Sequence, residues 1–278
     1  MQEKEQYPRP IEAFFIIIIS FVFVVIITQS LIWLFVPSPE QIKSDSMLLK
    51  ALITFGEIGL IIIPVLYIKY RRLSLTTIFR WNNIPSYLYL WSFVIGFGIS
   101  VIGDELDRLI SLIIPAPELL GEIAEALRIS SAGDFFILTV GAVLAAALVE
   151  ESIIRGFLQI SLEKYQDVTR AVIYASLAWT IIHGMIYWAI QIFLLGIILG
   201  ILAWRSNSIV PSVIGHATNN AAALIFYNID QDKLNGIYLW GGHVSPLVLG
   251  IGFIGLIYGM RQFYHHYNNK PVYPDTSS

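Results

Sequence analysis

Eight long apolar stretches dominate the sequence, and they restrict the fold to helices that cross a lipid bilayer. A membrane-spanning helix needs about 20 mostly apolar residues. Stretches near that length occupy residues 13–36, 47–68, 87–103, 135–158, 171–185, 186–204, 209–227 and 244–262. Only 13% of the residues are charged, whereas soluble domains carry about 25%. We therefore predict an all-α, polytopic integral membrane protein with about eight transmembrane helices, placed in a prokaryotic plasma membrane or an internal membrane.

The distribution of basic residues predicts the orientation of these helices. If eight helices alternate from a cytoplasmic N-terminus, eleven of the 17 Lys and Arg residues fall on the cytoplasmic side and five on the other, with Arg155 inside a span. Cytoplasmic loops of membrane proteins carry an excess of Lys and Arg. Seven or nine helices would remove this bias, so we expect both termini in the cytoplasm. The first stretch is longer than the apolar region of a signal peptide, and we expect it to be retained as a helix.

Two features of the composition exclude classes of function. The chain has no cysteine, which excludes disulfides, thiolate metal sites and a cysteine nucleophile. Its Lys and Arg residues are scattered and form no basic stripe of the kind that binds nucleic acid. We expect the lipid bilayer, and no nucleic acid, among its partners.

The connection at about 104–134 is the longest on the predicted outer side, and it is acidic. Within it, Leu119, Leu120, Ile123 and Leu127 recur at helical spacing. This pattern favours a short helix that lies on the membrane surface. A lid or substrate gate is the alternative.

The fourth stretch contains three charged residues after an apolar run. A charge at the centre of a bilayer costs about 2.5–3.5 kcal/mol, so such groups are expected to be paired or protonated. Glu151 and Arg155 are four residues apart with the glutamate first, which favours an ion pair on one helix face. Glu150 points about 100° away and has no partner in its own helix. An unpaired interior carboxylate suits a general acid or base, while a buried polar cluster that only fixes helix packing is the alternative.

Two further stretches carry polar groups at a similar depth. Trp179 and His183 share one face of the fifth predicted helix, and His216 and Asn220 share one face of the seventh. Glu150, His183 and His216 lie eleven to fourteen residues from the nearest predicted cytoplasmic charge, about 17–21 Å along an unbroken helix. We therefore expect these residues to meet in one composite site.

These residues resemble the motifs of the CPBP family of intramembrane proteases, which comprises CAAX proteases and bacteriocin-processing enzymes and is also called the ABI family. The family pattern is Glu-Glu-x-x-x-Arg, then Phe-x-x-x-His, then His-x-x-x-Asn or Asp. The chain has the corresponding residues in that order at 150–155, 179–183 and 216–220. The one departure is Trp179 in place of phenylalanine, which keeps a large aromatic wall.

The resemblance implies a role in catalysis for each of these residues. Glu150 would activate water with the help of His183, while His216 and Asn220 would polarise the scissile carbonyl and stabilise its oxyanion. Three further residues would support the site: Glu151, Arg155 and Trp179. The protein would then be an intramembrane endopeptidase similar to CAAX prenyl proteases, acting on a peptide or membrane protein that enters from the bilayer or the cytoplasmic side.

The resemblance also implies that the chain is divided into three regions. Residues 1–132 would hold the first three helices and the acidic loop. Residues 133–228 would form the catalytic core with helices four to seven. Residues 229–278 would contain the last helix and a cytoplasmic tail.

The catalytic type and two other functions stay open. Two histidines and a glutamate form a recognised zinc set, here Glu150, His183 and His216, but the chain has no His-Glu-x-x-His signature. We favour glutamate catalysis without a cofactor, with zinc as the alternative. An ion- or proton-coupled carrier would use the same groups as a path, and a non-catalytic immunity or scaffold protein would use them only for packing.

Overall fold

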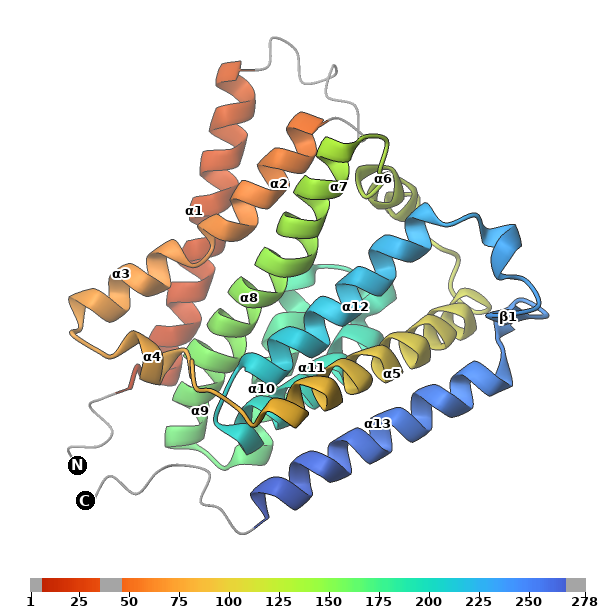
Figure 1. Cartoon of the computed structure of the whole chain (residues 1–278). Coiled ribbons are helices and arrows are strands. Elements are labelled where there is room, and N and C mark those ends of the chain that lie inside the picture. The colour runs from red at the N-terminus through yellow and green to blue at the C-terminus, as the bar shows by residue number, and fades with distance from the viewer. Residues whose placement is uncertain (1–6, 36–46, 269–278) are drawn as a thin grey trace.

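The computed structural model describes residues 7–35 and 47–268, in which helices form a bundle next to one short β-hairpin (Figure 1). In chain order the α-helices are α1 (Pro10–Phe35), α2 (Met47–Gly59), α3 (Ile62–Tyr70), α4 (Leu75–Ile78), α5 (Ser86–Ser111), α6 (Leu119–Ala126), α7 (Ala132–Leu138), α8 (Ala146–Glu151), α9 (Gln159–Tyr165), α10 (Val168–His183), α11 (Ala189–Ser206), α12 (Val210–Asn228) and α13 (Pro246–Tyr267). Short 3₁₀ turns, η5 (Ile186–Trp188) and η6 (Gln231–Leu234), precede α11 and follow α12. Strands β1 (Leu239–Trp240) and β2 (His243–Val244) pair antiparallel before α13.

Six helical segments among the described residues are long and apolar enough to cross a membrane. They are Pro10–Phe35, Met47–Tyr70, Ser86–Ser111, Ala132–Tyr165, Ile186–Ser206 and Pro246–Tyr267. The other two predicted spans, 171–185 and 209–227, are also helical, as α10 with 16 residues and α12 with 19. The chain is a multi-pass, all-α integral membrane protein, as predicted.

The helix ends that we expect in the cytoplasm lie together at one end of the bundle. Asn82, before α5, donates a hydrogen bond of 2.6 Å to the carbonyl of Asn207, between α11 and α12. Tyr87 Oη in α5 and His266 Nδ1 in α13 are 2.7 Å apart. The number of eight crossings and the cytoplasmic side of both termini stay predictions. Some residues used for them lie outside the described part of the chain: Lys4, Val36, Lys43 and Lys270.

The third predicted span was too short, because the connection at 104–134 is largely helical. Helix α5 continues to Ser111, so Asp104 and Asp107 lie on a helix and not in a loop. An i,i+4 bond of 3.1 Å from Arg108 Nε to Asp104 stabilises this extension. Helix α6 is present as the spacing predicted, and none of its residues is buried.

The segment that carries Glu150 and Glu151 is not a regular α-helix. Two π-helical turns, η3 (Thr139–Ala145) and η4 (Ser152–Leu158), flank the six residues of α8. Such turns are rare and are often found at functional sites. The depth of Glu150 calculated for an unbroken α-helix is therefore not accurate for this segment.

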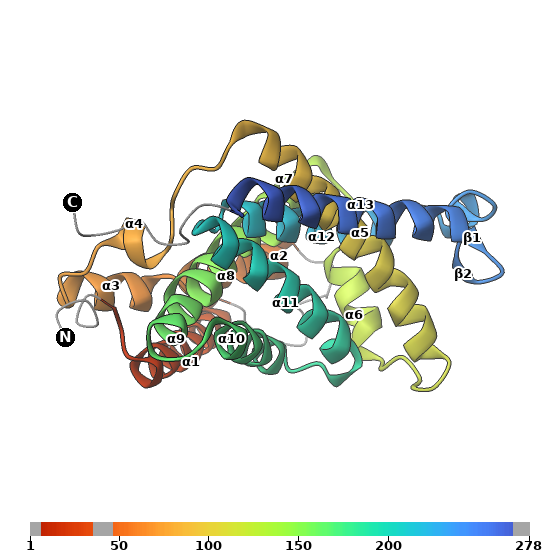
Figure 2. The same ribbon diagram turned by 90° about the horizontal axis from the view of Figure 1, so that it is seen from below.

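Close glycine contacts hold α5 against α12 and α13, which lie alongside it (Figures 1 and 2). A Cβ atom on Gly96 would lie 2.6 Å from the carbonyl oxygen of Gly215 in α12. One on Gly98 would lie 2.6 Å from the carbonyl oxygen of Gly252 in α13. Small residues let helix backbones approach closely in membranes. Helix α5 thus fixes the position of α12, which carries His216 and Asn220.

Gly96→Ala is expected to lower the free energy of unfolding by about 1–3 kcal/mol, the usual cost of overpacking. The added methyl group meets backbone atoms of α12, which cannot move aside without shifting the helix. Unfolding by sodium dodecyl sulfate in mixed micelles measures the change. Gly250→Ala in α13 is the matched control, because nothing lies within 4 Å of its Cβ position. Equal stability of both variants would contradict the expectation.

Candidate active site

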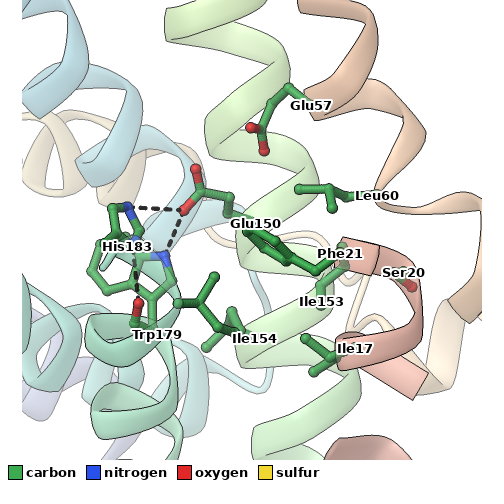
Figure 3. Close-up of a pocket in the computed structure, with 11 residues that line it drawn as sticks. Ile17, Ser20, Phe21, Glu57, Leu60, Glu150, Ile153, Ile154, Trp179 and His183 are labelled. Carbon is green, nitrogen blue, oxygen red and sulfur yellow. Dashed lines mark hydrogen bonds and ion pairs between the residues drawn. The ribbon is translucent and has the colours of Figure 1, made fainter. Parts of the chain in front are cut away.

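Glu150 lines a cavity between α1, α2, α8 and α10, where its carboxylate meets two residues of α10 (Figure 3). The indole Nε1 of Trp179 donates a hydrogen bond of 2.5 Å to Glu150 Oε2. The same oxygen lies 3.8 Å from His183 Nε2. The side chains of Glu150 and His183 are 17% and 32% exposed, so both reach the cavity. The other lining residues are mostly apolar, among them Ile17 and Phe21 of α1, Leu60, and Ile153 and Ile154.

The ring of His183 is held in one orientation by its own helix. Its Nδ1 lies 2.8 Å from the carbonyl oxygen of Trp179. Because a carbonyl only accepts hydrogen bonds, Nδ1 carries the proton. In the neutral imidazole, Nε2 is then an acceptor directed at Glu150. A water molecule that donates to both groups would therefore be polarised from two sides.

Behind Glu150, Glu151 forms a buried network with a guanidinium and an imidazole. Arg155 Nη1 donates to Glu151 Oε1 at 2.8 Å, which confirms the ion pair predicted from their spacing. His216 Nδ1 lies 3.0 Å from the same oxygen. The side chains of Glu151 and Arg155 are fully buried, and that of His216 is 4% exposed. Glu151 thus orients His216 in α12 while its charge is balanced by Arg155.

Trp179 joins the two groups of residues. Its ring lies edge-on to both histidines, 5.0 Å from His183 and 5.3 Å from His216 between ring centroids. The Arg155 guanidinium lies 4.3 Å from the centre of the indole. The sequence interpretation treated Trp179 only as an aromatic wall, but its N–H also reaches the carboxylate of Glu150. Phenylalanine has no group that could make this bond.

Asn220 and His216 line a second cavity that adjoins the first. Trp179 and His183 line both cavities. Asn220 Nδ2 donates to the carbonyl of Ala142 in η3 at 3.0 Å, which leaves its second amide proton available. The structure therefore brings all seven sequence-predicted site residues to the two cavities or to the network behind them.

Residues outside the three motifs also reach these cavities. Ile123 of α6 and Leu127, which follows it, line the second cavity, as does Asp107 of α5. The connection at 104–134 was predicted to form a surface helix, with a substrate gate as the alternative, and its position beside the second cavity is compatible with both. Glu57 of α2 lines the first cavity. Its only signal in the sequence is an ionisable residue inside an apolar span, which marks a candidate functional residue.

The residues do not form a metal site in this arrangement. In the described ranges 7–35 and 47–268, no three His, Asp or Glu side chains are placed so that they could hold a metal ion. The Nδ1 atoms of His183 and His216 are both engaged, with a carbonyl and with Glu151, so these rings could bind a metal only through Nε2. The zinc set of Glu150, His183 and His216 is not assembled in this arrangement, and no step of the mechanism proposed for this site passes through a metal.

Comparison with known proteins gives one match. Residues 132–222 match the family model "Rce1-like", described as type II CAAX prenyl endopeptidase Rce1-like. This segment contains all three motifs and most of the predicted core at 133–228. Neither the curated proteins nor the solved structures gave a match to the chain.

Proposed function

We propose that this chain is an intramembrane endopeptidase in which Glu150 activates water. The match of residues 132–222 to the Rce1-like family of type II CAAX prenyl endopeptidases supports this proposal. The observation that supports this most is the placement of the Glu150 carboxylate in a cavity, 3.8 Å from the acceptor nitrogen of His183. A general base needs an accessible carboxylate within reach of a water molecule. The division of the chain at 132 and 228 is part of the same proposal.

The reaction begins with water between Glu150 and His183. Glu150 takes one proton from the water as the water oxygen attacks the carbonyl carbon of the peptide bond. The bond from oxygen to carbon forms, and the carbonyl π electrons move to the carbonyl oxygen. The Trp179 N–H holds Glu150 Oε2 in place, so little reorientation is needed for the proton transfer.

His216 and Asn220 stabilise the negative oxygen that results. Because Nδ1 of His216 donates to Glu151, its Nε2 donates to the oxyanion when the imidazole is protonated. The second amide proton of Asn220 provides another donor. Donors fixed before the reaction stabilise a developing charge more than mobile water does, especially in a cavity of low polarity.

The final step returns the proton that Glu150 took. The protonated carboxyl of Glu150 donates it to the nitrogen of the leaving amine, the carbon–nitrogen bond breaks, and a new carboxyl terminus and a new amino terminus result. Glu150 is then ionised again. The overall reaction is hydrolysis of one peptide bond by one water molecule.

The proposed substrate is a peptide or membrane protein whose scissile carbonyl lies where the two cavities adjoin, next to His183. The first cavity has a wall of apolar side chains from α1 and from Leu60, which follows α2, and this wall suits a substrate that arrives from the bilayer or from the cytoplasmic side. The family name implies prenylated substrates, and cleavage of a farnesylated peptide is one form of this proposal.

Terminal-peptide profiling of cells that express the wild type or Glu150→Gln at matched levels tests the proposed function. New amino termini present only with the wild type are expected, and they would identify the substrate class. Identical profiles from two folded proteins would reject the endopeptidase and return attention to a carrier or a scaffold.

Asn220→Ala is expected to lower kcat by about 10²-fold, the usual effect of losing one oxyanion donor. KM should change little, because the bond forms only in the transition state. Asn220→Asp keeps the shape but replaces the amide donor with a carboxyl group, so it should exceed Asn220→Ala only at acidic pH, where the carboxyl group carries a proton that it can donate. Steady-state kinetics of the purified variants measure both constants. A selective rise in KM would instead indicate that Asn220 binds the ground state.

A further inference from the structure

A second carboxyl group, from outside the matched segment, faces Glu150 in the first cavity. Glu57 lies on α2, and Figure 3 shows its carboxyl group directed across the cavity toward Glu150. Its Oε1 atom is buried and has no hydrogen-bond partner among the residues that the structure describes. The side chains around it are apolar, including Leu60, which follows α2, and Ile17 of α1.

The charged groups on α2 and on the helices that pack against it do not neutralise Glu57 in the described part of the chain. Most of them are engaged with other partners: Lys50 with Asp134, Glu12 with Tyr67 and Arg71, and Glu151 with Arg155. The π-helical turn η3 carries no titratable side chain. The titratable groups that line the cavity with Glu57 are therefore Glu150 of α8 and His183 of α10.

Two carboxylates in one apolar cavity are not expected to be ionised together. Glu57 and Glu150 line the same cavity, and like charges in surroundings of low polarity repel strongly. The usual outcome is that the pair holds one proton. Glu150 accepts the indole N–H of Trp179, which stabilises its ionised form, whereas Glu57 has no such donor.

We propose that Glu57 is a positioning residue for the hydrolytic reaction, which holds the single proton of this pair and leaves the negative charge on Glu150. The inference rests on the proposed endopeptidase function, because its effect on cleavage acts through Glu150. A neutral Glu57 leaves Glu150 free to accept the proton of water. An ionised Glu57 would add a second negative charge near the developing oxyanion and would oppose its formation.

The position of the proton can be measured without any substrate. Dicyclohexylcarbodiimide, which reacts with protonated carboxyl groups in apolar surroundings, is applied to the purified full chain over a range of pH, and the labelled residue is identified by mass spectrometry. We expect the label on Glu57 at pH 7. In Glu150→Gln the midpoint of labelling should move about one pH unit lower, because the like charge is gone.

Two variants make the assignment specific. Trp179→Phe removes the donor that favours the charge on Glu150, so part of the label should move from Glu57 to Glu150. Glu12→Gln makes the same chemical change at a carboxylate that is bonded to Tyr67 and Arg71, away from the cavity. It should leave the labelling of Glu57 in place. A Glu57 that is not labelled, or a midpoint that is the same in Glu150→Gln, would overturn the inference.

The effect on cleavage is measured with a fluorogenic farnesylated peptide that ends in Cys-aliphatic-aliphatic-X. The wild-type rate should fall at alkaline pH as Glu57 ionises, and in Glu57→Gln this fall should occur at least about one pH unit higher. A purely structural residue would not move the alkaline limb, so an unmoved limb would refute the positioning function. If the wild type does not cleave this peptide while Glu57 is labelled as expected, the farnesylated-substrate form of the endopeptidase proposal fails and the shared proton stands.

Discussion

Glu150→Gln is expected to reduce the rate of peptide cleavage by about 10²- to 10⁴-fold, the range that a general base contributes. The glutamine oxygen can still accept the N–H of Trp179, so the shape of the cavity and the helix contacts are kept. The amide cannot take a proton from water. Initial rates of the purified proteins in lipid nanodiscs, at saturating and at low substrate concentrations, measure the loss.

The expected loss lies in kcat and not in KM, since the substrate does not bind through the proton that Glu150 takes. Glu12→Gln is the matched control for the chemical change, because Glu12 lies outside both cavities. Thermal unfolding of each variant verifies that it is folded. A Glu150→Gln variant that cleaves within about threefold of the wild type would be too active for a protein that has lost its general base, and another base would then have to be sought.

Glu151→Leu is expected to lower the free energy of unfolding by about 3–5 kcal/mol, the usual cost of removing one partner of a buried ion pair. Arg155 is fully buried, and its Nη1 bond to Glu151 is its only ion pair among the described residues. Its other contacts, with the carbonyl of Gly196 at 3.3 Å and with the ring of Trp179, do not neutralise the charge. Unfolding in mixed micelles measures this effect.

The double variant Glu151→Leu/Arg155→Met separates stability from catalysis. Replacing a buried ion pair with apolar side chains is often neutral or stabilising, so most of the lost stability should return. Cleavage should stay low, because His216 has lost the acceptor that orients its ring. If the double variant is no more stable than Glu151→Leu, the unpaired charge of Arg155 is not the cause of the loss.

The residues of the site were predictable where their spacing defines a helix face. Glu151 and Arg155 are four residues apart, and the ion pair between them follows from helix geometry alone. His183 and His216 were placed near the glutamates because their depths in three apolar stretches agreed. The spans were predictable for a similar reason, since long apolar runs leave few alternatives to a membrane helix.

Contacts between distant helices were not predictable from one sequence. The hydrogen bond from Trp179 to Glu150 depends on the rotation of α10 against α8, which no local pattern encodes. The position of Glu57 opposite Glu150 depends on how α2 packs, and a lone glutamate in an apolar stretch gives no direction. The extension of α5 to Ser111 was missed because its acidic residues resemble a loop, although their spacing with Arg108 supports a helix.

The π-helical turns beside α8 make the number of residues in this segment as important as their identity. A π-helical turn closes around one residue more than an α-helical turn, and each residue of an α-helix adds a rotation of about 100°. Deleting one residue within Thr139–Ala145 would leave all three motifs intact and would favour a regular helix there. The helix after the deletion would be rotated relative to α2, so Glu150 and Glu151 would face different neighbours. A related chain that lacks one residue in this turn could therefore carry the same motif and still direct its two glutamates to a different face of the helix.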